Sequence, residues 1–247
     1  FIFGNPDNKA WTLSLYNALN DSDYQNPDDI VFTTIDSAVY MGMKNDVSFL
    51  VDDRMSFYEQ QSSFNPNMPI RGLMYFSKLY DKYIKSNNLN IYGSTTMNLP
   101  VPRFVVFYNG DDRTVEKRTE LRLTDLFDDP EVSDIEVTAH MIDINSESED
   151  EILQKCSVLS GYSYLVSLIQ SYSKTESNLE DAVLDAVDKC IEDNILKDVL
   201  LAHKSEVFDM LLTEYNEKEV LQQIYEEGKA EGEAKGIAEG KAEGIAE

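Results

Sequence analysis

The stretch "KNDVSFLVDDRMSFYEQQ", residues 44–61, carries two mainly apolar runs on either side of an Asp-Asp pair. Apolar runs of this length, rich in β-branched and aromatic residues, are typical of β-strands. Asp tolerates the unusual backbone angles of a tight turn, so we predict a hairpin with Asp52 and Asp53 at the centre of its turn.

The register of this hairpin brings two acidic side chains together. Leu50 lies opposite Met55, and on the same side of the ribbon Asp46 lies opposite Glu59, because side chains alternate with a period of two. Opposed residues have Cβ atoms about 5 Å apart, so two carboxylates held there repel each other unless a cation compensates. Asp and Glu are the hard oxygen ligands that magnesium prefers. The hairpin therefore predicts a Mg²⁺ site, and the alternative is a pair of carboxylates that face solvent independently.

The next pair on this side of the ribbon is Lys44 and Gln61. A magnesium ion that shares its coordination positions with a phosphate oxygen polarises the phosphate and lowers the pKa of an attacking water. Lys44 is placed to stabilise charge that develops on the phosphate or to position the nucleophile. The predicted chemistry is phosphodiester hydrolysis.

The segments around the hairpin alternate between helix and strand patterns. Helical spacing of apolar residues predicts a helix over residues 6–20 and an amphipathic helix over residues 69–86. This mixture predicts a mixed α/β fold. We predict strands over residues 30–35, 38–43, 46–51, 55–60, 103–110 and 135–144.

The ordered segments resemble those of a known nuclease family. Asp46, followed in the next strand by Glu59, Gln60 and Gln61, is similar to the D…(D/E)xK core of the PD-(D/E)XK nuclease superfamily, with glutamine in place of lysine. The series "YMGMKNDVSFLVDD…FYEQQSSFNPNMPIRGLMYFSKLYDKYI", "PRFVVFYNG" and "LRLTDLF", followed by a glycine-spaced acidic tail, resembles the recombination-promoting nuclease/transposase (Rpn-like) group. The resemblance covers nearly the whole chain.

This resemblance implies a restriction-endonuclease-like αβββαβ core and metal-dependent hydrolysis of DNA. It also implies that Mg²⁺ is held by Asp46, Glu59 and the main-chain carbonyl of Gln60. The chain departs from the family pattern at Gln61, since glutamine can orient water but carries no charge and is no acid or base near neutral pH. Loss of such a group commonly lowers a rate by about 10²–10⁴-fold, and Lys44 is the candidate to supply the missing charge.

A stripe of cations on the second helix is the candidate DNA-binding surface. Arg71 follows Gln61 most closely and is expected to approach the site, where a guanidinium can bind phosphate through two hydrogen bonds. The alternative is an ordinary solvated helix face. The stripe consists of Arg71, Lys78, Lys82 and Lys85, spaced with Tyr75 at helical intervals.

The C-terminal part of the chain has a different character. We predict a nuclease-like domain over residues 1–145, a helical extension over residues 150–216 and an acidic tail over residues 217–247, in which glycine recurs at every fourth residue from Gly228. Each glycine costs a helix about 1 kcal/mol relative to alanine. The tail is therefore either a glycine stripe for helix contact in a homo-oligomer or a frayed, solvated extension.

Charge and composition limit the possible functions. The 247 residues carry a net charge of −25, which opposes broad nonspecific binding of nucleic acid. Residues 1–145 hold 12 Lys and Arg against 22 Asp and Glu, and residues 146–247 hold 9 against 24, so the acidity weighs most on the C-terminal part. The charge, together with Gln61, favours an alternative function, a catalytically inactive nuclease fold that serves in interaction or regulation.

The remaining features predict an intracellular protein. No run of about eighteen apolar residues is present, which predicts no membrane span, and we expect a cytoplasmic protein. Cys156 and Cys190 lie far from any CxxC or histidine spacing and are expected to be buried thiols. His140 lies in an alternating strand and is expected to be a packed or surface residue.

Overall fold

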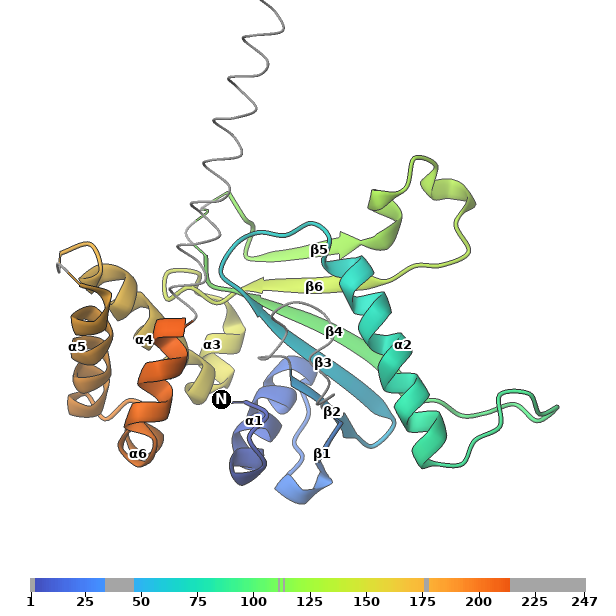
Figure 1. Cartoon of the computed structure of the whole chain (residues 1–247), viewed down its shortest axis with the longest axis horizontal. Coiled ribbons are helices and arrows are strands. Elements are labelled where there is room, and N and C mark those ends of the chain that lie inside the picture. The colour runs from blue at the N-terminus through green and yellow to red at the C-terminus, as the bar shows by residue number, and fades with distance from the viewer. Residues whose placement is uncertain (1–2, 34–46, 111, 113, 176–177, 214–247) are drawn as a thin grey trace, which may run out of the picture. The chain divides into compact units, whose positions relative to one another are not determined.

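A computed structural model describes residues 3–33, 47–110, 112, 114–175 and 178–213 (Figure 1). The chain divides into two compact units, Phe1–Leu168 and Ile169–Glu247. The first unit contains a mixed sheet of six strands in the order β1-β2-β3-β4-β6-β5, which confirms the predicted mixed α/β class. The strands are β1 (Val31–Phe32), β2 (Val47–Val51), β3 (Arg54–Gln61), β4 (Val101–Tyr108), β5 (Arg118–Arg122) and β6 (Thr138–Asp143).

The predicted hairpin is confirmed in its turn and in its register. Strands β2 and β3 are antiparallel, with Leu50 opposite Met55 and Val47 opposite Tyr58. Asp52 and Asp53 form the turn, and Asp52 has a φ of 51°, which Asp accommodates better than most residues. Strands β3, β4 and β6 then run parallel to one another, and β5 is antiparallel to β6.

Two helices pack on opposite faces of this sheet. Alternation along β3 directs Phe57 to one face, where its ring contacts Phe76 of α2. On the other face, Tyr58 contacts Phe49 of β2, whose ring in turn contacts Tyr16 of α1. The α2 face carries an apolar core built mainly from Met55, Phe57, Met68, Phe76, Leu79, Phe104, Val106, Tyr108, Ala139 and Met141.

The helices lie close to their predicted positions. Helix α1 follows a short 3₁₀ turn, as expected for residues 6–20, and α2 begins one residue before Pro69. In the described part of the strand predicted at residues 30–35, Val31–Phe32 forms β1, and the strand predicted at 38–43 lies outside the described residues. The helices are α1 (Lys9–Asn20), α2 (Met68–Ser86), α3 (Glu151–Lys155), α4 (Ser157–Tyr172), α5 (Leu179–Glu192) and α6 (Lys197–Ala202), and the 3₁₀ turns are Pro6–Asn8, Pro27–Asp29, Leu123–Leu126 and Pro130–Val132.

The described part of the predicted extension is helical and contains no strand, as expected. The first compact unit, however, continues to Leu168, beyond the predicted boundary at residue 145, and the division falls within α4. In the second unit, Asn178 accepts a hydrogen bond from the amide of Glu180 and caps α5. Cys190 on this helix is buried, as is Cys156, which confirms the prediction for both thiols. Among the described residues, no helix has the length and apolar character needed to cross a membrane.

Asp150 joins the segment just after the predicted boundary to the sheet. Arg118 of β5 donates to both carboxylate oxygens of Asp150, from Nε at 2.7 Å and from Nη2 at 2.9 Å. The same carboxylate accepts the amide of Ile152 at 2.9 Å and so caps α3. With its side chain only 5% exposed, Asp150 ties α3 to the sheet.

Asp150→Asn is expected to lower the free energy of unfolding at pH 7 by about 2 kcal/mol, because it removes a charge-assisted bidentate contact and weakens a helix cap. Hydrogen bonding to Arg118 holds the pKa of Asp150 below its ordinary value. As the pH falls, Asp150 therefore takes up a proton in the unfolded chain before it does so in the folded protein. The stability that the ionised carboxylate contributes is lost as the pH falls from about 4 through the folded pKa. Urea unfolding between pH 7 and pH 3 should show the two proteins converging in acid.

The matched control is Glu151→Gln. Its side chain is 60% exposed and lies 3.3 Å from the same guanidinium. The expected change is within about 0.5 kcal/mol. A loss equal to that of Asp150→Asn would mean that the surface charge matters and not the buried contact.

Candidate active site at the carboxyl end of strand β3

Glu59 is a buried carboxylate near the end of β3. It follows Phe57 by two residues and therefore lies on the α2 face of the sheet. The side chain is 3% exposed, and two donors converge on its Oε1 atom. Arg71 Nη2 lies 2.5 Å from Oε1, and Gln61 Nε2 donates to it at 2.7 Å. A buried carboxylate is costly unless it is paired, and here a guanidinium compensates it.

Arg71 reaches this carboxylate because α2 starts directly beside the end of β3. The helix begins at Met68, so Arg71 lies in its first turn, with a side chain 26% exposed. The Nη1 atom also contacts Met68 Sδ at 3.7 Å. The expected approach of Arg71 to the site is therefore observed, at the carboxylate itself.

The parallel strands bring further polar groups to the same edge of the sheet. Gln61 is in register with Tyr108, and Tyr108 with Asp143, so these three residues lie on the α2 face in one row. Asp143 Oδ1 accepts a hydrogen bond from Asn145 Nδ2 at 2.7 Å. Asn145 Nδ2 also donates to the carbonyl of Gly110 at 3.0 Å.

Tyr108, Asp143 and Asn145 were not among the site residues predicted from the sequence. The available signal was the position of "YNG" and "IDIN" at the ends of two apolar strands. Polar residues at such ends converge only if the strands are parallel neighbours, and that pairing is not readable from either segment alone. Gly110 is required here, because a Cβ atom on it would lie 2.3 Å from the carbonyl oxygen of Ser62.

Two predicted site residues, Asp46 and Lys44, lie outside the described residues. The observed register reaches Val47 opposite Tyr58. Gln60 is described and is in register with Phe107 of β4. The predicted pairing of Asp46 with Glu59 thus stays a prediction.

The residues present match a hard divalent cation in donor type. Glu59 offers carboxylate oxygen, and the main chain of β3 offers carbonyl oxygen at Gln60, both of which suit Mg²⁺. Among the residues that the structure describes, no three His, Cys, Asp or Glu side chains gather closely enough to hold a metal ion. A complete site would require Asp46 as its second carboxylate.

The rest of the cation stripe lies on the surface of α2. Lys78, Lys82 and Lys85 are exposed. Lys82 donates to the carbonyl of Thr33 at 3.2 Å, and Lys85 forms a surface ion pair with Asp81 at 2.6 Å. Arg71 therefore differs from the lysines, which remain candidates for contact with a phosphate backbone.

Comparison of the chain with protein-family models, with curated proteins and with solved structures finds no match.

Proposed function

We propose that this protein is a metal-dependent DNA endonuclease that hydrolyses phosphodiester bonds, with a role in DNA recombination or transposition. The observation that carries the proposal is the buried carboxylate of Glu59, which sits at the end of a hairpin whose register is the predicted one. The order of α1, β1, β2, β3, α2 and β4 along the chain supports it, since an αβββαβ core has this order. The proposal includes a location in the cytoplasm, which is compatible with DNA as the substrate.

Each residue predicted for the active site has a role in this proposal. Asp46, Glu59 and the carbonyl of Gln60 would hold Mg²⁺, which supplies polarisation of a phosphate oxygen and a lower pKa for water. Gln61, which donates to Glu59 Oε1, holds the carboxylate in place and is near enough to orient a water. Lys44 would contribute positive charge in place of the family lysine.

Cations would position the DNA. Arg71 neutralises Glu59 when no substrate is bound, and its guanidinium can turn to a phosphate once a metal ion compensates the carboxylate. Lys78, Lys82 and Lys85 would contact the phosphate backbone further along α2. In a chain with a net charge of −25, DNA binding would depend on this local surface and fall steeply with salt.

The test is cleavage of supercoiled plasmid by the full chain with Mg²⁺, with EDTA, and with the variant Asp46→Ala. Wild type should nick DNA with Mg²⁺ only, and Asp46→Ala should lose at least about 10²-fold in rate, because the site loses one of its two carboxylates. Equal nicking by both proteins would refute the site and point to a contaminating nuclease.

The ion pair between Arg71 and Glu59 favours a second function, a nuclease fold without catalysis that acts in interaction or regulation. In this case the guanidinium replaces the metal ion permanently. Metal titration separates the two functions, because a ligand that binds only the folded protein raises the melting temperature. Stabilisation by Mg²⁺ or Mn²⁺ that Glu59→Ala abolishes supports the endonuclease, and its absence supports the second function.

A further inference from the structure

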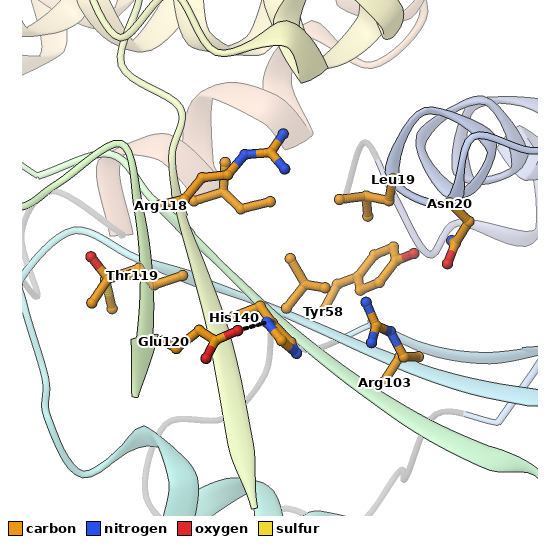
Figure 2. Close-up of a pocket in the computed structure, with 11 residues that line it drawn as sticks. Leu19, Asn20, Tyr58, Arg103, Arg118, Thr119, Glu120 and His140 are labelled. Atoms are coloured by element: carbon orange, nitrogen blue, oxygen red, sulfur yellow. Dashed lines mark ion pairs between the residues drawn. The ribbon is translucent and has the colours of Figure 1, made fainter. Parts of the chain in front are cut away.

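A cavity of ≈ 380 Å³ lies on the α1 face of the sheet, the face opposite to Glu59. Figure 2 shows Leu19 and Asn20 of α1 on one side of it and strand side chains across its floor. Its size falls within the range of small-molecule sites, about 300–1,000 Å³. It is lined by Leu19, Asn20, Tyr58, Arg103, Val105, Arg118, Thr119, Glu120, His140, Met141 and Ile142.

The floor of the cavity is a single row of residues across four strands. Tyr58 of β3 is in register with Val105 of β4, Val105 with His140 of β6, and His140 with Glu120 of β5. These four side chains share the α1 face because residues in register point to the same side of a sheet. The row is apolar at Val105 and polar at His140 and Glu120.

Two arginines flank this row, one on each side. Arg103 precedes Val105 by two residues in β4, whereas Arg118 of β5 is in register with Ile142, two residues beyond His140. Strands rise about 3.3 Å per residue, so the arginines are offset from the row in opposite directions by about 7 Å each.

Only one of the two positive charges is compensated. Arg118 is bound by Asp150 at 2.7 Å and 2.9 Å, and the carboxylate of Glu120 pairs with Arg122 at 3.1 Å. In the part of the chain that the structure describes, Arg103 forms no ion pair.

Two further titratable groups of the row, His140 and Tyr58, are uncharged near pH 7, so the carboxylate of Glu120 is the negative charge among the residues that line the cavity. Burial, and then the charge of Arg103, lowers the pKa of His140, whose Nδ1 lies 3.7 Å from Glu120. His140 is therefore a neutral imidazole near pH 7 and can exchange hydrogen bonds with a ligand. Burial raises the pKa of Tyr58, which stays an uncharged phenol.

We propose that this cavity binds a small organic anion, a carboxylate or phosphate on a compact, partly apolar body. The anionic group would be bound by the forked donors of Arg103, which suit two oxygens of an oxyanion. The body would lie over Val105 and accept or donate hydrogen bonds at His140 and Asn20. The site is independent of the proposed hydrolysis, since it uses the other face of the sheet.

Isothermal titration calorimetry of the full chain at low salt tests the proposal, with AMP, benzoate and inorganic phosphate as probes. At least one of the organic anions should bind with a Kd below about 1 mM and more tightly than inorganic phosphate, which lacks the body. Arg103→Ala should weaken this binding about 10–100-fold, the loss expected for a charge-assisted contact, and Arg103→Lys should restore part of it.

Lys174→Ala is the matched control, because it removes the same charge from a position that is exposed, as Arg103 is, and that belongs neither to this cavity nor to the cation stripe of α2. It should leave binding unchanged within about twofold. Tighter binding of AMP would identify phosphate as the recognised group, and tighter binding of benzoate would identify carboxylate. Two results would overturn the proposal: no binding of either organic anion to wild type, or equal weakening by Arg103→Ala and Lys174→Ala.

Discussion

Glu59→Ala is expected to lower the rate of Mg²⁺-dependent plasmid cleavage by about 10³-fold or more. Glu59 is a buried carboxylate on the α2 face near the end of β3, and its loss would remove both the proposed metal ligand and the partner of Arg71. Without it, the guanidinium of Arg71 repels a metal ion at the same place. The measurement is the initial rate of nicking at matched protein concentrations, over a range of Mg²⁺.

Glu59→Gln distinguishes loss of the charge from loss of the fold. The amide has nearly the same shape as the carboxylate and fits the same buried position, so the protein should remain folded by circular dichroism. Its cleavage rate should nonetheless fall to a similar extent, because an amide oxygen is a weaker ligand for Mg²⁺ than a carboxylate. Cleavage by Glu59→Gln at the wild-type rate would exclude Glu59 from the active site.

Arg71→Ala is expected to lower the free energy of unfolding by about 3 kcal/mol. Removal of one partner from a buried ion pair leaves an uncompensated charge, which commonly costs about 3–5 kcal/mol, and the 26% exposure of Arg71 reduces the effect. The loss should be smaller in the Glu59→Gln background, where no charge remains to be compensated. Urea unfolding of the four proteins of this double-mutant cycle gives the coupling between the two side chains.

Lys85→Ala is the control for loss of a cation from the same helix. Lys85 pairs with Asp81 at the surface, with a side chain 73% exposed, so the expected change is within about 0.5 kcal/mol. If Arg71→Ala has an effect as small as this, Glu59 is compensated by another group.

Local patterns predicted the hairpin and the two helices. The position of Asp52 and Asp53 at the centre of the turn specified the pairing of Leu50 with Met55, because a loop of three residues would shift the register by one. Strand β5 was not predicted, because its sequence is mostly polar. In "RTELR" only Leu121 is buried, so the segment carries too few apolar residues to indicate an edge strand.

The sequence by itself determined the pairing of β2 with β3, and it placed Glu59 on the same side of the hairpin as Leu50 and Met55. The tertiary structure alone decided that Arg71 compensates Glu59, that Gln61, Tyr108 and Asp143 share a row, and that Arg103 lies at a cavity. The physical reason is the range of the interactions. Alternation and turn geometry act between near neighbours in the chain, whereas parallel strand pairing joins segments whose order and register no single segment encodes.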